Sequence, residues 1–243
     1  MSETLEPFNK RNVILKRAAI IFASVVLVIA ISIASFLVYN NVYYTPFWVN
    51  GQSMYPTLNK DAKNKNGELY GESGSSVQEG SYDIDYGFMD NRESAINKIV
   101  RFNIIICKYS NDSSDASNKV KRVIALPGET FYISNKSEDN GSLYVANSDG
   151  KFELIIQPID DAIIKKAQYP TKYASAYTLS NNEYFVLGDN RSHSSDSRIN
   201  GPVTKNLIVG VVKGLNGKAK IGYDENGNNL KPVSVSKYWP RYF

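Results

Sequence analysis

The hydrophobic pattern of the chain begins with one long apolar run. Residues 18–38 contain no charged residue, proline or glycine. At 1.5 Å per residue, a helix of about 21 residues crosses the hydrocarbon layer of a membrane, about 30 Å thick. The apolar core of a cleaved signal peptide is shorter, about 7 to 15 residues. The run therefore predicts a retained transmembrane helix over residues 18–38, preceded by a short tail of residues 1–17.

The residues on either side of this run predict its orientation. Four basic residues precede it, and the next basic residue after it is Lys60. The four are Lys10, Arg11, Lys16 and Arg17. Aromatic residues are frequent between positions 39 and 48, as at a membrane interface. Because basic flanks stay in the cytoplasm, we expect a single-pass protein of the cell membrane with residues 39–243 outside the cytoplasm.

After the apolar run, the pattern changes to short apolar or alternating segments separated by turn residues, with no long segment of helical period. Turns are expected at Pro127-Gly128, Asn140-Gly141, Asp149-Gly150, Gly188 and Asn216-Gly217. Strands are expected at residues 45–50, 98–109, 119–126, 130–134, 142–147, 152–157, 184–189 and 207–215. The pattern predicts a mainly β domain over residues 39–243, with a polar insertion at about 59–80.

Composition narrows the classes of function. The net charge of +4 is mild and the basic residues are scattered, so a nucleic-acid partner is not indicated. Cys107 is the only cysteine and His193 the only histidine, which excludes an internal disulfide and a tetrahedral zinc site built from cysteine and histidine. We expect Cys107 to be a small buried apolar residue, and we expect no metal and no cofactor.

Ser53, in the segment NGQSMYPTL, is the first candidate for chemistry. It follows an aromatic strand and precedes a proline, which stops strand pairing. Such a turn can expose the serine hydroxyl and leave a backbone N–H free to face an oxyanion. The segment alone favours an ordinary loop serine over a reactive one.

Lys121, in the segment KVKRVIALPGE, is the second candidate. Strand alternation places it on the same face as Val123 and Ala125. Burial among apolar groups lowers the pKa of a lysine, and a neutral lysine beside a hydroxyl can act as a general base. The alternative is a strand lysine whose amino group extends to water.

The third candidate is the segment GDNRSHSSDSR, residues 188–198. It follows an apolar strand and combines serines with two aspartates and two arginines. Such acids and arginines can pair and hold a polar loop rigid, although a solvated charged loop has the same composition.

Taken together and in this order behind one apolar helix, SMYPTL, KRVIALPGE and GDNRSHSSDSR resemble the bacterial type I signal peptidases, membrane-bound serine proteases that remove signal peptides from exported proteins. The resemblance extends from about residue 44 to the C-terminal region and points to the Gram-positive type of branch. It implies a β-sheet-rich catalytic domain with a smaller inserted β region at about residues 130–180.

The resemblance implies a role for each matching residue. Ser53 corresponds to the nucleophile and Lys121 to its general base. Arg122 corresponds to the basic residue that follows this lysine. Met54 corresponds to the methionine that lies against the substrate-binding groove.

The third segment supplies the implied supporting residues. Ser194 corresponds to a serine that orients the lysine ammonium. Asp196 and Arg198 correspond to a structural ion pair of the site, and residues 188–191 match the opening of the loop.

This sequence departs from the family pattern at three positions. Gly51 stands where some members have a serine that serves as a second oxyanion donor. Asn103 stands where the family usually has an aspartate, so no role is transferred to it. His193 occupies a variable position of the last loop.

The resemblance implies an endopeptidase that acts on secretory preproteins at the membrane surface and cleaves after small-x-small sites. Three other interpretations remain open. The chain could be a Ser53/His193 hydrolase, a self-cleaving repressor of the LexA type, or an anchored binding protein that retains the fold without catalytic activity. The repressor reading lacks its N-terminal DNA-binding module. Ser234 and Lys237 have the spacing of a Ser-x-x-Lys acylase without its companion motif, which favours a chance match.

Overall fold

The computed structural model describes residues 7–70, 77–109 and 117–243, apart from the side chains of residues 7–11, 40 and 41. Residues 1–6 of the predicted tail and 71–76 of the predicted insertion therefore lie outside the described residues. The described chain divides into two units, residues 1–44 and 45–243.

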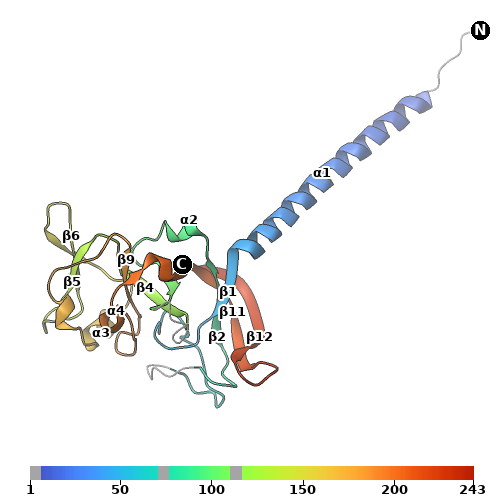
Figure 1. The fold of residues 1–243 in the computed structure, drawn as a ribbon. Coiled ribbons are helices and arrows are strands. Elements are labelled where there is room, and N and C mark those ends of the chain that lie inside the picture. Colours follow the sequence, from blue (N-terminus) through green and yellow to red (C-terminus); the bar gives the residue numbers. More distant parts are fainter. Residues whose placement is uncertain (1–6, 71–76, 110–116) are drawn as a thin grey trace, which may run out of the picture. The chain divides into compact units, whose positions relative to one another are not determined.

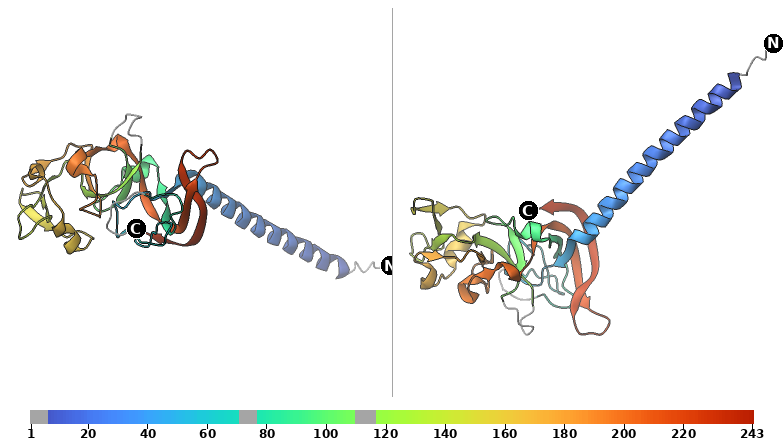
Figure 2. Two further views of the ribbon diagram at one scale, coloured as in Figure 1. Left: turned by 90° about the horizontal axis from the view of Figure 1, so that it is seen from below. Right: turned by 45° about the horizontal axis from the view of Figure 1, so that its top comes forward.

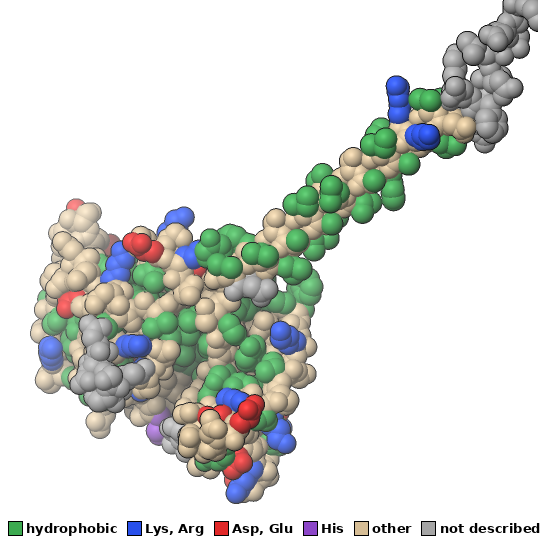
Figure 3. Space-filling view, turned by 45° about the vertical axis from the view of Figure 1, so that its right-hand side comes forward, with side chains coloured by type: hydrophobic (Ala, Val, Ile, Leu, Met, Phe, Trp, Pro, Cys, Tyr) green, Lys and Arg blue, Asp and Glu red, His purple; other side chains and the backbone are tan. Residues whose placement is uncertain are grey.

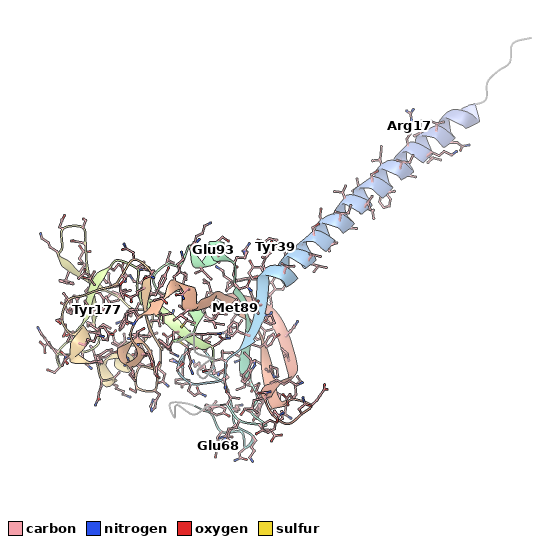
Figure 4. The ribbon with its side chains drawn as sticks, in the orientation of Figure 1. Arg17, Tyr39, Glu68, Met89, Glu93 and Tyr177 are labelled. Atoms are coloured by element: carbon pink, nitrogen blue, oxygen red, sulfur yellow. The ribbon has the colours of Figure 1, made fainter. Side chains whose placement is uncertain are left out.

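The first unit is the helix α1, Pro7–Tyr43, which contains the predicted apolar span (Figure 1). Within it, the candidate membrane span Asn12–Tyr39 contains an 18-residue window with a mean hydropathy of 2.8 and no buried residue. Apolar side chains cover its surface (Figure 3), and Arg17 and Tyr39 lie near its two ends (Figure 4). The hydroxyls of Ser24 and Ser32 donate to carbonyls one turn earlier, at 2.8 Å. The helix is consistent with a single membrane anchor.

The second unit contains an antiparallel eight-stranded sheet in the order β1-β2-β11-β3-β4-β9-β10, with β12 paired to β11. The long hairpin of β11 and β12 lies at the opposite end of this unit from β5 and β6 (Figures 1 and 2). The strands are β1 Tyr44–Trp48, β2 Ile84–Asp90, β3 Ile104–Cys107, β4 Lys119–Ala125, β9 Glu183–Leu187, β10 Val203–Thr204, β11 Ile208–Tyr223 and β12 Leu230–Tyr242.

A four-stranded antiparallel sheet, in the order β7-β6-β5-β8, uses residues from the predicted insert of about 130–180. Its strands are β5 Thr130–Ile133, β6 Leu143–Ala146, β7 Phe152–Ile155 and β8 Tyr177–Thr178. Stacked and edge-to-face aromatic rings hold its surfaces together, including Tyr132 on Tyr144. The helices are short: α2 Glu93–Ile96, α3 Asp161–Lys166, α4 Ser197–Asn200, and the 3₁₀ turns η2 Thr171–Tyr173 and η3 Lys205–Leu207. The chain is thus a long apolar helix followed by a β-rich unit, as the pattern predicted.

The strands β3, β4 and β9 are buried on both faces. Along β3, Ile104 and Ile106 pack in one core cluster with Met54, whereas Ile105 and Cys107 pack in another with Val123. This follows from the two-residue period of a strand, which sends neighbouring side chains to opposite faces. A side chain in the middle of β4 is therefore removed from water whichever face it occupies. Cys107 is fully buried and free, as expected.

Two local predictions were wrong. The expected strand 98–109 is a strand only at Ile104–Cys107, because Asn103 Oδ1 accepts from Val100 N at 3.0 Å and stabilises a turn before it. Asn216-Gly217 is not a hairpin turn but lies inside β11, at a register shift against both β2 and β12. The hairpin turn lies further on, where Gly227 adopts a φ of 71°.

Four strands were not predicted: the two-residue strands β8 and β10, and the longer strands β2 and β12. The strand β2 buries the carboxylates of Asp85 and Asp90, which interrupt its apolar pattern. The strand β12 contains Pro232 and Pro240, residues that an edge strand tolerates because one row of its N–H groups faces away from the sheet.

Candidate active site

Ser53 lies in a tight turn that begins just after β1. The N–H of Tyr55 donates to Gln52 O at 3.0 Å, and the N–H of Leu58 donates to Met54 O at 2.9 Å. Met54 and Leu58 are fully buried and anchor the turn in the core. Between them and β1, Ser53 is only partly buried. The apolar residues that follow the serine therefore fix its position while its side chain stays near the surface.

Lys121 extends from β4 towards this turn. Its Nζ lies 2.9 Å from Ser53 Oγ and 3.0 Å from Val120 O. The side chain shares its face of the sheet with Ile105, the residue opposite on β3, and with Val123. Lys121 is only 3% exposed, and this burial lowers its pKa to about 8. The lysine predicted on an apolar face is thus buried, easily deprotonated and within hydrogen-bond distance of the serine.

The segment after β9 holds the serine turn from the other side. The N–H of Asn190 donates to Ser53 O at 3.0 Å, and its Nδ2 donates to Gln52 O at 3.2 Å. Gly188 leaves no space for a side chain, since a Cβ there would overlap Ser53 O and Ser194 Oγ. The close approach of the two segments thus depends on a glycine at position 188.

A buried ion pair connects β4 to this segment. Arg122 donates from Nε to Asp189 Oδ1 at 2.8 Å and from Nη2 to Asp189 Oδ2 at 2.6 Å. Thr57 Oγ1, from the serine turn, donates to the same carboxylate at 2.6 Å. Asp189 is fully buried, so these donors replace the hydrogen bonds that water would give to its carboxylate oxygens. The pair joins all three sequence motifs, a connection that sequence reasoning missed.

A second ion pair stabilises the end of the segment. Arg198 donates from Nε to Asp196 Oδ1 at 2.8 Å and from Nη2 to Asp196 Oδ2 at 2.9 Å. The same carboxylate accepts the N–H of Gly188 at 3.0 Å. Asp196 thereby connects α4 to the glycine that contacts the serine turn.

Ser194 and His193 are not hydrogen-bonded to the Ser53 and Lys121 side chains. Ser194 Oγ is buried and has no hydrogen-bond partner among the described residues, so the contact with Lys121 that the resemblance implies is not formed here. His193 Nδ1 lies 3.3 Å from Asn190 Oδ1, and its ring is exposed. Ser234 and Lys237 are exposed on β12 and, three residues apart on a strand, point to opposite faces.

No group of three or more histidine, cysteine or acidic side chains suited to a metal ion occurs in the part of the chain that the structure describes.

The sequence model of the family described as "Signal peptidase, peptidase S26" matches residues 20–215. The chain belongs to this family of serine peptidases.

Two named relatives match most of this chain, and one solved structure matches about half of it. A signal peptidase I of Bacillus amyloliquefaciens is 28% identical over 223 residues, covering 88% of this chain and 93% of that protein. Signal peptidase IB of Staphylococcus aureus is 26% identical over 191 residues, covering 76% of this chain and 83% of that protein. A crystal structure of a signal peptidase I from Enterococcus faecalis V583 matches 47% of this chain and 96% of that chain at 27% identity, with a TM-score of 0.33.

Substitution of Gly188 tests the packing of this signal peptidase family member around its serine turn. We expect Gly188→Ala to lower the free energy of unfolding by about 2 kcal/mol, because the added methyl group must displace the backbone of Ser53. Urea denaturation of the full chain in detergent measures this change. Gly51→Ala is the matched control, since a Cβ at Gly51 meets nothing within 4 Å. Equal stability of the two variants would contradict the packing described.

Substitution of Lys121 tests the cost of its burial. The pKa is lowered from 10.5 to about 8, so below pH 8 the folded state carries a desolvated ammonium that the unfolded chain solvates freely. This penalty is present below pH 8 and disappears as the pH rises through 10.5. We expect Lys121→Met to raise the free energy of unfolding at pH 7 by about 1 to 3 kcal/mol. Lys119→Met is the control: Lys119 lies on the same strand and is partly exposed, so its substitution should leave the free energy of unfolding nearly unchanged. A Lys121→Met variant that is less stable than wild type would contradict the desolvation penalty.

Proposed function

We propose that this chain is a membrane-anchored serine endopeptidase that removes signal peptides from exported preproteins, with Ser53 as nucleophile and Lys121 as general base. One observation carries the proposal: Lys121 Nζ lies 2.9 Å from Ser53 Oγ while its pKa is lowered to about 8. A lysine with an ordinary pKa is almost fully protonated near neutral pH and cannot accept a proton. Burial therefore supplies the basicity that histidine supplies in other serine proteases.

The reaction begins when neutral Lys121 accepts the Ser53 hydroxyl proton as Oγ attacks the carbonyl carbon of the scissile bond. The carbonyl oxygen becomes an oxyanion, and the Ser53 backbone N–H is the donor we assign to it. That N–H donates to no protein group within the described ranges of the chain, which leaves it available. With Gly51 two positions earlier, no side-chain hydroxyl is present there to add a second hydrogen bond.

The second half of the cycle uses the same two groups. The Lys121 ammonium returns its proton to the leaving amine, and the peptide bond breaks to give an acyl-enzyme on Ser53 Oγ. Lys121 then accepts a proton from water as its oxygen attacks the ester carbonyl, and it donates that proton to Ser53 Oγ as the ester bond breaks. The signal peptide leaves with a free carboxyl group, and Ser53 and neutral Lys121 are restored. We assign Ser194 the role of orienting the Lys121 ammonium, which requires its unpartnered hydroxyl to move into hydrogen-bond distance of Nζ. The ion pairs of Arg122 and Arg198 keep the surrounding segments in place.

We further propose that the substrate binds as an added strand beside β1. This strand lies at the end of the eight-stranded sheet, so it can accept a partner on its outer edge. Alternate side chains of such a strand point to the same face, which fits recognition of small residues at every second position. Met54, fully buried beside the serine, lies under the floor of this groove.

The anchor and its orientation complete the proposal. With Lys16 and Arg17 at the N-terminal end of the apolar span, we place the N-terminus in the cytoplasm and the β-rich unit outside it, at the membrane surface. A signal peptide embedded in the same membrane would then present its cleavage site close to Ser53.

The dyad assignment predicts which substitutions abolish cleavage. Purified full-length protein in detergent should process a model preprotein, and sequencing of the product should show a new N-terminus after a small-x-small site. We expect Ser53→Ala and Lys121→Met each to lower kcat/KM at least about a thousandfold, because each removes a group that changes bonding in the reaction. His193→Ala is the control, and its activity should remain close to wild type.

The alternatives give distinct results in the same assay. A Ser53/His193 hydrolase loses activity with His193→Ala and keeps it with Lys121→Met. A binding protein that keeps only the fold shows no cleavage even as wild type. Either outcome would overturn the proposed function.

The lowered pKa of Lys121 predicts the pH dependence of cleavage. Protonated Lys121 is inactive as a base, so kcat/KM should rise about tenfold per pH unit below pH 8 and level off above it. Initial rates at low substrate concentration between pH 5 and pH 9.5 measure this profile. A rise centred near pH 6.5 would instead indicate the histidine and contradict the assignment.

A further inference from the structure

A cavity of about 540 Å³ is lined by Ser194, whose hydroxyl and Ser53 O both lie close to Gly188. Neither Ser53 nor Lys121 lines it. One wall is the segment 166–170, at the end of α3 and just after it. The other wall belongs to the loop after β9 and includes Arg191, Ser194 and Arg198. Its volume is within the range of sites that bind small molecules or side chains.

The charges around the cavity are all positive. Lys166, Arg191 and Arg198 line it, and no acidic side chain among the described residues does. The charge of Arg198 is balanced by Asp196. Arg191 differs, because no carboxylate of the described chain lies within 4 Å of its guanidinium. Arg191 is therefore a buried positive charge in the cavity wall without a carboxylate counterion among the described residues.

The burial of Arg191 makes this charge unusual. Its side chain is among the largest fully buried ones, with the residue 2% exposed. Nε donates to Gly188 O at 3.0 Å and Nη1 donates to Tyr169 Oη at 3.4 Å, whereas Nη2 has no partner among the described residues. A buried guanidinium normally pairs with a carboxylate or a phosphate, often through two hydrogen bonds. Ser194 Oγ, on the same cavity, is a second buried group without a partner.

The position of the cavity relative to Ser53 indicates what could supply the missing anion. The sheet order places β1 at one end and β9 and β10 at the other. Ser53 follows β1, and the loop after β9 contacts it through Asn190. A polypeptide that lies along β1 as far as Ser53 and continues beyond it therefore reaches the loop that forms the cavity wall.

We propose that this cavity is a subsite for an acidic side chain of the preprotein, located on the mature side of the scissile bond. The proposal rests on the function proposed above. The substrate carboxylate pairs with the Arg191 and Lys166 side chains and accepts a hydrogen bond from Ser194. The site thus distinguishes substrates by charge just after the cleavage point, in addition to the small residues before it.

The experiment compares three model preproteins that differ at one of the first mature positions, which carries Glu, Gln or Lys in turn. Each of the first five mature positions is tested, with full-length enzyme in detergent at low salt. We expect kcat/KM to be about three- to fivefold higher for Glu than for Gln at one or two positions, and lower still for Lys. The preference should decrease as salt is raised, because salt screens partly exposed charges.

A matched pair of enzyme variants tests whether the preference for Glu over Gln substrates comes from this cavity. Lys166 lines the cavity, whereas Lys165, also exposed on α3, lines a different one. Lys166→Glu should reduce the Glu-to-Gln ratio to about one or below, and Lys165→Glu should leave it at the wild-type value. Neither residue belongs to the proposed catalytic groups, so cleavage of the Gln substrate should continue in both variants.

The outcomes separate this inference from the proposed function. No cleavage of any substrate by the wild type contradicts the function itself. Cleavage that is indifferent to Glu, Gln and Lys at all five positions overturns the subsite and leaves the function intact. A Glu preference that Lys166→Glu and Lys165→Glu change equally also overturns it, since the preference then reflects the general charge of the surface.

Discussion

The burial of one amino group against one hydroxyl is the constraint on which the rest of the site depends. Lys121 is 3% exposed on β4, one of three neighbouring strands that are buried on both faces, and its Nζ lies 2.9 Å from Ser53 Oγ. A solvated lysine would be charged and would have no capacity to accept a proton near neutral pH. Burial of this amino group destabilises the folded state. The same burial lowers the pKa of Lys121 and so allows it to act as the proposed base.

The remaining polar contacts of the site keep that pair aligned. The bidentate ion pair of Arg122 and Asp189 joins β4 to the loop after β9, and Thr57 attaches the serine turn to the same carboxylate. The Asp196 carboxylate accepts a hydrogen bond from the N–H of Gly188. Because Gly188 has no side chain, Ser53 O and Ser194 Oγ can pack directly against it. Removal of one partner would leave a buried charge unpaired, which costs more than an exposed pair contributes. The segments that carry Ser53 and Lys121 are therefore both bonded to the loop at 188–198, which keeps them in register.

The sequence allowed the apolar helix, the β-rich unit and the position of Lys121 on an apolar strand face to be predicted, because each follows from a local pattern of apolar residues. It left open whether the amino group of Lys121 is buried or extends to water. It did not reveal β2, whose buried Asp85 binds Lys218 and the N–H of Asn59 from distant segments. Nor did it distinguish a hairpin from a bulge at Asn216-Gly217, since that depends on which strands pair there. The Arg122–Asp189 pair spans 67 positions and was likewise invisible to local patterns. The motif resemblance supplied the grouping of Ser53 with Lys121 that no local pattern contains.

The most direct test of this account is the pKa of Lys121 itself. Full-length protein in detergent, with its lysines labelled with ¹³C at Cε, can be titrated by NMR, and Lys121→Met identifies the resonance by its loss. The account predicts a midpoint of about 8, lowered by burial from the ordinary value of 10.5. A midpoint near 10.4, the value of a solvated lysine, would contradict it.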